Sequence, residues 1–216
     1  MLDHYARGLF TVLMTPIARV LKRMGVTPDA VTIVGSLGAC LAALIAYPAG
    51  ELFWGTLIIT FFIFSDLVDG VLARLPDADG NPPVRTEGAS KWGAFLDSTL
   101  DRVVDFVIFG SIAYWFFTGG GRPDIGALAL ACLSLGGVVS YARAKAESLG
   151  LTANVGIAER SERIVLVLVF TGLNGLGLSA WVLYGVLWLL AAASTITVFQ
   201  RVGAVRKQTL GAPAAS

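Results

Sequence analysis

The chain has 216 residues, of which 56% are hydrophobic and only 14% are charged. A soluble domain of this size needs more polar residues for its surface, so the composition excludes an ordinary soluble protein and favours an integral membrane protein. The formal net charge of +1 hides an asymmetric distribution of basic residues along the chain. A nucleic-acid partner is not expected.

Residues 1–24 are predicted to form an amphipathic helix at the membrane surface. Apolar residues recur at steps of three and four from Leu2 to Met24, with basic residues between them. This pattern is typical of a helix that lies in the interface. The alternative is the solvated face of a packed helix, but the apolar segments that follow favour the interface.

Six apolar segments follow, each close to the ~20 residues that a helix needs to cross a bilayer. They are residues 29–47, 51–75, 91–118, 124–149, 157–174 and 178–201. Stretches rich in Gly and Pro separate most of them. The predicted fold is therefore an all-α integral membrane protein with six transmembrane helices and a juxtamembrane amphipathic helix. The predicted organisation is a surface helix at 1–24, a catalytic domain at 25–205 and a flexible tail at 206–216.

Basic residues predict the orientation of these segments. With a cytoplasmic N-terminal helix and six alternating crossings, fifteen of the sixteen Lys and Arg residues lie on the cytoplasmic side, and only Arg122 lies outside. With an odd number of crossings, these basic residues would be distributed over both sides of the membrane. We therefore expect a multi-pass protein of the cell membrane, with its N-terminus and its active site in the cytoplasm.

Four aspartates stand at the predicted cytoplasmic ends of the second and third segments. Asp66 and Asp69 are three residues apart, and Asp97 and Asp101 are four apart, so each pair shares a helical face. The two helices are consecutive and antiparallel, so both pairs are expected at a similar depth. Four carboxylates in one place repel each other, and a divalent cation such as Mg²⁺ or Mn²⁺ relieves that repulsion.

The alternative is that these aspartates are solvated charges, or that they pair with Arg74 and Arg102. Ionisable groups at the edge of a membrane are more often functional when several converge. Two nearby glycines, Gly70 and Gly93, would let a bulky ligand approach the backbone, and Arg74 could pair with a phosphate group.

The stretch "DLVDGVLAR…GAFLDSTLD" resembles the signature of the CDP-alcohol phosphotransferase family, D-x2-D-G-x2-A-R followed by G-x3-D-x3-D. Its fixed positions are filled by Asp66, Asp69, Gly70, Ala73, Arg74, Gly93, Asp97 and Asp101. The six-helix layout also resembles the family. The spacer between the two halves of the signature departs from the family pattern. It comprises residues 75–92, is longer than usual, and is expected to include an inserted polar loop.

The resemblance implies an enzyme that transfers the phosphatidyl group of CDP-diacylglycerol to an alcohol and releases CMP. Metal binding maps to Asp66, Asp69 and Asp97, and Asp101 maps to a metal ligand that is also the general base. The implied nucleotide-lipid pocket is lined by Gly70, Arg74, Ser90 and Gly93. The family also implies a homodimer.

A second polar cluster is expected from the ends of the last three segments. Its members are Ser140, Arg143, Lys145, Arg160, Arg163 and Arg201. Such a basic pocket suits an acceptor that carries its own phosphate. The alternative is ordinary topology-setting charge that contacts anionic lipid.

"SYARAKAESLG" and "NVGIAERSERIVL" resemble the actinobacterial branch of the family that makes phosphatidylinositol phosphate from CDP-diacylglycerol and inositol phosphate. That branch implies that the basic pocket holds the acceptor phosphate. The main alternative is a CDP-diacylglycerol–glycerol-3-phosphate phosphatidyltransferase, a phosphatidylglycerophosphate synthase. An aspartate-rich prenyltransferase and a transporter are less favoured, because the motif order and the position of the charges at the helix ends both argue against them.

Overall fold

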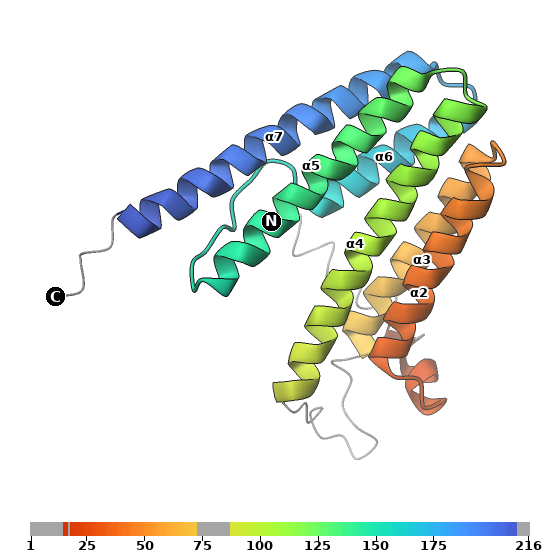
Figure 1. Cartoon of the computed structure of the whole chain (residues 1–216). Coiled ribbons are helices and arrows are strands. Elements are labelled where there is room, and N and C mark those ends of the chain that lie inside the picture. The colour runs from red at the N-terminus through yellow and green to blue at the C-terminus, as the bar shows by residue number, and fades with distance from the viewer. Residues whose placement is uncertain (1–14, 17, 73–86, 211–216) are drawn as a thin grey trace. The chain divides into compact units, whose positions relative to one another are not determined.

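The computed structural model describes residues 15, 16, 18–72 and 87–210, with the side chains of residues 65–71, 87, 89 and 90 left out. This part of the chain contains six long helices and no strand (Figure 1). They are α2 (Pro28–Ala46), α3 (Leu52–Leu72), α4 (Glu87–Thr118), α5 (Pro123–Ser148), α6 (Arg160–Gly175) and α7 (Ala180–Leu210). Residues 15, 16 and 18–23 are also helical, and the rest of the predicted surface helix before residue 24 lies outside the described residues.

The chain divides into two compact units. Unit 1 comprises Met1–Ala42 and Leu57–Val104, and unit 2 comprises Ala43–Thr56 and Asp105–Ser216. Unit 1 thus holds all eight positions of the aspartate motif, and unit 2 holds the predicted basic pocket. Each unit is described by itself.

In unit 1, α2 and α3 approach each other closely at Gly38. A Cβ atom at this position would overlap the ring of Phe62, so the contact requires a residue without a side chain. At the end of α3, Leu72 forms a small buried cluster with Ala18. These two contacts pack α3, the helix in which the aspartate motif begins, against α2 and the helical segment before it.

In unit 2, α7 packs against both α5 and α6 (Figure 1). The thiol of Cys132 on α5 donates a hydrogen bond to the backbone oxygen of Leu187 on α7, at 3.2 Å. Leu183, Leu187 and Leu190 bury one face of α7. These contacts hold the three helices that carry the predicted basic pocket.

Many large apolar side chains remain exposed, such as Trp54 and Phe61 on α3 and Phe199 on α7. Helices that present apolar residues outward are typical of a membrane protein. Within the described residues, three helices are long and apolar enough to span a bilayer: α2, α5 and α7. The predicted number of six spans is therefore not confirmed, although all six predicted segments are helical.

In the described part of the chain, the other three helices lack an uninterrupted apolar stretch that is long enough to span a bilayer, each for a physical reason. The described apolar part of α3, Leu52–Phe64, is short. The first half of α4 carries the charged residues of the motif, and α6 has only 16 residues, about 24 Å at 1.5 Å per residue. By contrast, α7 has 31 residues, about 46 Å, and exceeds the ~30 Å hydrocarbon core.

Two helix ends differ from the sequence-based boundaries by four residues or more. Helix α4 begins at Glu87 rather than at residue 91, and α7 ends at Leu210 rather than at residue 201. The first five residues of the predicted flexible tail are therefore helical, because no proline interrupts the helix before Gly211. Residues 211–216 lie outside the described residues.

Candidate active site

The first half of the aspartate motif lies at the end of α3. The helix includes positions 66 and 69, which are three residues apart and therefore on one face, as predicted. The side chains of Asp66 and Asp69 lie outside the described residues, as does the whole of Arg74. The convergence of four carboxylates therefore stays a prediction.

The second half of the motif lies on α4, where Asp97 is exposed and Asp101 is half-buried. One helical turn separates the two carboxylates, so they lie on the same face of the helix. The Nη2 atom of Arg102 is 3.9 Å from the Oδ2 atom of Asp101, which is too long for a hydrogen bond, so this contact is Coulombic. No group of three potential metal ligands occurs among the described side chains, a set that excludes Asp66 and Asp69.

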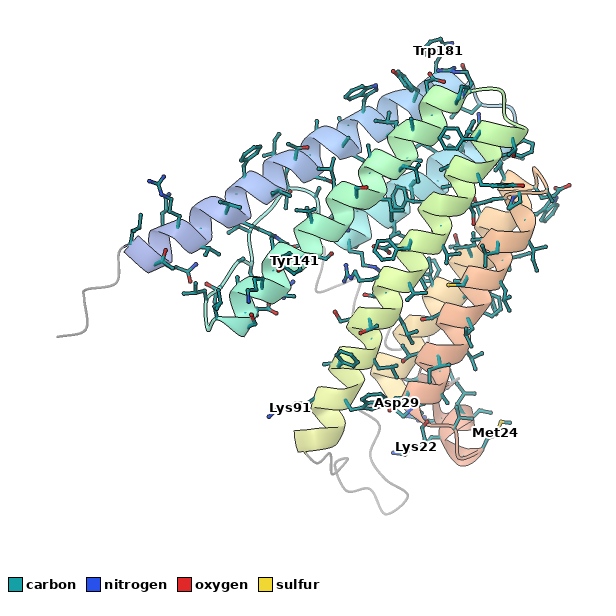
Figure 2. The ribbon with its side chains drawn as sticks, in the orientation of Figure 1. Lys22, Met24, Asp29, Lys91, Tyr141 and Trp181 are labelled. Atoms are coloured by element: carbon teal, nitrogen blue, oxygen red, sulfur yellow. The ribbon has the colours of Figure 1, made fainter. Side chains whose placement is uncertain are left out.

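Gly93 lies opposite the start of α2. A Cβ atom at position 93 would be 3.7 Å from the Oδ1 atom of Asp29, an ordinary van der Waals distance. Asp29 and Lys91 lie at the same end of unit 1 (Figure 2). Ser90 belongs to the first turn of α4, but its side chain lies outside the described residues.

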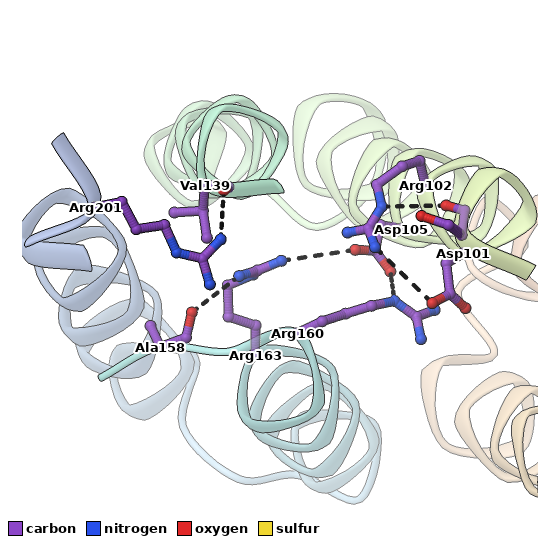
Figure 3. Close-up of polar contacts among 9 residues, drawn as sticks. Asp101, Arg102, Asp105, Val139, Ala158, Arg160, Arg163 and Arg201 are labelled. Atoms are coloured by element: carbon purple, nitrogen blue, oxygen red, sulfur yellow. Dashed lines mark hydrogen bonds and ion pairs between the residues drawn. The ribbon is translucent and has the colours of Figure 1, made fainter. Parts of the chain in front are cut away.

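In unit 2 the structure brings together a carboxylate and three arginines, here called the Asp105 cluster: Asp105, Arg160, Arg163 and Arg201 (Figure 3). The Nε atom of Arg160 donates to the Oδ1 atom of Asp105 at 3.0 Å. The Nη2 atom of Arg163 lies 3.8 Å from the other oxygen, Oδ2. Asp105 is 7% exposed and Arg163 only 2%, so both charges are removed from solvent. Buried charges of this kind are tolerated only when they are paired.

Arg201 joins the cluster from α7 and is 4% exposed. Its Nη1 atom donates to the backbone oxygen of Val139 on α5 at 2.6 Å, and its Nε atom donates to that of Val155 at 3.0 Å (Figure 3). Arg163 donates to the backbone oxygen of Ala158 at 3.1 Å. Both buried arginines therefore hold the segment that connects α5 to α6.

Two further residues of α7 fasten the same segment. Thr197 accepts hydrogen bonds from the backbone N–H groups of Ile157 and Ala158, each at 3.1 Å. Gln208 accepts from the backbone N–H of Thr152 at 3.0 Å and donates to its backbone oxygen at 2.6 Å. The connection of residues 149–159 is thus held along α7 by side chains, because it has no regular structure of its own.

The remaining predicted acceptor residues lie near the end of α5. Ser140 is half-buried, and Lys145 is exposed. Arg143 forms an exposed ion pair with Glu147, one turn along the helix, at 2.9 Å. An exposed pair of this kind contributes little to stability, so it does not fix the position of Arg143.

Sequence reasoning missed two residues that organise this region. Asp105 is four residues after Asp101, so the same i, i+4 spacing that linked Asp97 to Asp101 also pointed to it. Thr197 gave no such signal, because its partners are backbone N–H groups about forty residues away.

Residues 25–199 match the CDP-alcohol phosphatidyltransferase family, and the chain belongs to this family. The protein is accordingly a membrane-embedded transferase of this enzyme class, which confirms the resemblance seen in the aspartate motif.

Two named relatives cover nearly the whole chain. The phosphatidylinositol phosphate synthase of Streptomyces avermitilis is 47% identical over 222 residues, which cover 100% of this chain and 87% of the relative. The protein of the same name from Cutibacterium acnes is 44% identical over 214 residues, covering 96% of this chain and 98% of the relative.

Solved structures agree with this assignment. The phosphatidylinositol phosphate synthase of Mycobacterium tuberculosis with CDP-DAG bound is 37% identical, with a TM-score of 0.78 over 89% of this chain and 92% of that chain. The same enzyme in complex with manganese and citrate gives the same identity and TM-score, over 89% of this chain and 88% of that chain. That relative thus binds both a CDP-linked lipid and a divalent metal ion.

Proposed function

We propose that this enzyme transfers the phosphatidyl group of CDP-diacylglycerol to a hydroxyl of inositol phosphate, giving phosphatidylinositol phosphate and CMP. The observation that carries the proposal is the Asp105 cluster, in which two guanidinium groups contact one carboxylate and a third, that of Arg201, binds backbone oxygens. An excess of positive charge in a partly buried site favours an anionic ligand such as a phosphate group. The names of the relatives support the same acceptor.

In the proposed reaction, the acceptor hydroxyl attacks the phosphorus of the phosphatidyl group. The pyrophosphate bond breaks, and CMP leaves with the bonding electrons. Asp101 accepts the proton of the attacking hydroxyl, a role that suits a half-buried carboxylate.

The donor set fits a divalent metal ion. Asp97 and Asp101 share one face of α4, and the motif adds Asp66 and Asp69, so every proposed ligand is a carboxylate oxygen. When bound, Mg²⁺ or Mn²⁺ supplies positive charge that offsets the charge of the pyrophosphate. We assign Gly70, Arg74, Ser90 and Gly93 to the pocket for CDP-diacylglycerol. These assignments rest on the motif.

The acceptor phosphate is assigned to the basic pocket, with Arg160 as its main contact from the Asp105 cluster. The side chain of Arg160 is 25% exposed, whereas Arg163 and Arg201 are almost fully buried and hold backbone oxygens. Ser140, Arg143 and Lys145 complete the proposed pocket from α5. Within the Asp105 cluster, Arg160 is thus proposed to contact the ligand, and Arg163 and Arg201 are proposed to shape the pocket.

The same proposal places the active site and the N-terminus in the cytoplasm, with the enzyme in the cell membrane as a homodimer. The orientation is supported by the basic residues, of which only Arg122 falls outside when six crossings are counted. The homodimer rests on the family alone. CDP-linked substrates and phosphorylated polyols are charged, so they are expected on one aqueous side of the bilayer.

An acceptor panel tests the proposal. The purified protein is supplied with CDP-diacylglycerol and Mg²⁺ or Mn²⁺, and CMP release is measured with inositol phosphate, free inositol and glycerol 3-phosphate. Inositol phosphate is expected to give the fastest release. Equal rates with free inositol would show that the basic residues do not hold a phosphate, and faster release with glycerol 3-phosphate would assign the enzyme to the alternative branch.

A further inference from the structure

We infer that Asp105 is a positioning residue that orients Arg160 toward the phosphate of the acceptor. The inference rests on the proposed function, since it concerns the same acceptor. It assigns a role to a carboxylate that lies outside the eight-position motif.

The two arginines that contact Asp105 differ in their burial and in their other contacts. Arg163 is buried and is held by the backbone oxygen of Ala158 at 3.1 Å, so it forms a fixed side of the cluster. Arg160 is the more exposed partner, and its Nε atom donates to Asp105 at 3.0 Å (Figure 3). A contact through Nε fixes the plane of the guanidinium, and a planar fork binds phosphate well only when it is correctly oriented.

The charge balance supports the same role. The Asp105 cluster contains one carboxylate, and that carboxylate lies between Arg160 and Arg163. Without it the two guanidinium groups would repel each other, and the more exposed one would turn toward solvent. Asp105 therefore keeps Arg160 inside the pocket while the cluster stays positive enough to attract an anion.

The alternative is that Asp105 only neutralises Arg163 inside the protein. This alternative predicts a loss of stability without any specific effect on acceptor use. A double-mutant cycle between Asp105 and Arg160 separates the two possibilities, because a positioning residue acts only through its partner.

The experiment measures the KM for inositol phosphate, the KM for CDP-diacylglycerol and kcat in purified protein. Asp105→Asn keeps the shape of the side chain and is expected to raise the acceptor KM by roughly ten- to a hundredfold, and the same rise is expected for Arg160→Ala. The KM for the CDP-lipid is expected to change by less than about twofold. Combining the two substitutions should add nothing beyond Arg160→Ala alone.

Asp124→Asn is the matched control, because Asp124 also binds an arginine in unit 2. The carboxylate of Asp124 accepts two hydrogen bonds from Arg122, at 2.9 and 2.7 Å. Asp124 lies in the first turn of α5, whereas Ser140, Arg143 and Lys145 lie near the end of that helix. Neither KM is expected to change in this control. A charge-compensated pair, Asp105→Asn with Arg163→Gln, guards against misfolding. It should also raise the acceptor KM, because Arg160 still loses its ion pair with Asp105.

Three results would overturn the inference alone. One is an unchanged acceptor KM in Asp105→Asn while wild type uses inositol phosphate; another is full additivity with Arg160→Ala. Parallel loss of CDP-lipid use in both Asp105 variants would also overturn it, since Asp105 would then support the fold. If wild type releases no CMP with inositol phosphate, the proposed function fails, and the inference fails with it.

Discussion

Thr197→Val tests how the connection between α5 and α6 is held. Thr197 is fully buried, and its hydroxyl accepts hydrogen bonds from the backbone N–H groups of Ile157 and Ala158. Valine has nearly the same shape as threonine but lacks the hydroxyl. The substitution therefore leaves two backbone donors without their acceptor. It also removes the hydrogen bond that the hydroxyl donates to the backbone oxygen of Ala193, at 2.9 Å.

The magnitude follows from the burial of the two donors. A buried donor left unsatisfied costs about 1–3 kcal/mol. The N–H of Ala158 is buried and that of Ile157 is only partly so, which gives a total of about 2–4 kcal/mol. For a chain of this length, each kcal/mol lowers Tm by about 2–4 °C, so a fall of at least about 4 °C is expected.

Thr195→Val is the matched control on the same helix. The hydroxyl of Thr195 donates only to the backbone oxygen of Ala191, one turn earlier, at 2.8 Å. Its loss is expected to cost less than about 1 kcal/mol, because that oxygen also belongs to the helix ladder.

The assay is thermal unfolding of both variants in the same detergent, followed by acceptor kinetics. Thr197→Val is also expected to raise the KM for inositol phosphate more than the KM for CDP-diacylglycerol, because Ala158 holds Arg163. Equal Tm values for the two variants would refute the reasoning. They would mean that the connection is not held by the Thr197 hydroxyl.

Three further outcomes are expected. Asp97→Asn, or removal of divalent ions from wild type with a chelator, should lower CMP release by orders of magnitude; near-normal release in a chelator would contradict the metal assignment. Asp101→Asn should lower kcat by ~10²–10⁴ while the protein still binds CDP-diacylglycerol in a lipid-binding assay, and parallel loss of binding would mark Asp101 chiefly as a metal ligand. Trp181→Leu removes a ring whose centroid lies 4.0 Å from the guanidinium of Arg122, so thermal unfolding should report a small fall in Tm with unchanged acceptor KM. An unchanged Tm would show that this stacking contributes nothing.

The helices were predictable because their signals are local. Long apolar runs bounded by Gly and Pro gave all six segments, and most ends agree within a few residues. The exceptions are ends without a strong breaker, such as Leu210 on α7. The number of membrane crossings was harder to predict, because α4 and α6 combine apolar faces with the charges of the site.

The candidate site was predictable only where it depends on side-chain type and spacing. The aspartates follow a fixed pattern, and helical geometry places Asp97 and Asp101 on one face. The basic residues were predicted as one uniform phosphate pocket, but the structure gives Arg163 and Arg201 contacts with backbone oxygens. Every residue has a backbone oxygen, so sequence alone does not show which ones a buried arginine will meet.

The most direct test of the proposed activity follows the phosphate of the acceptor into the product. The purified enzyme is supplied with CDP-diacylglycerol and inositol phosphate whose phosphate is radiolabelled, and the lipid and aqueous fractions are separated. The account predicts that label enters the lipid fraction in a one-to-one ratio with CMP release, and that mass spectrometry finds a lipid with two phosphates and one inositol. Asp101→Asn should abolish this transfer. Release of CMP with all label left in the aqueous fraction would contradict the account, because the acceptor would then not be a phosphorylated polyol.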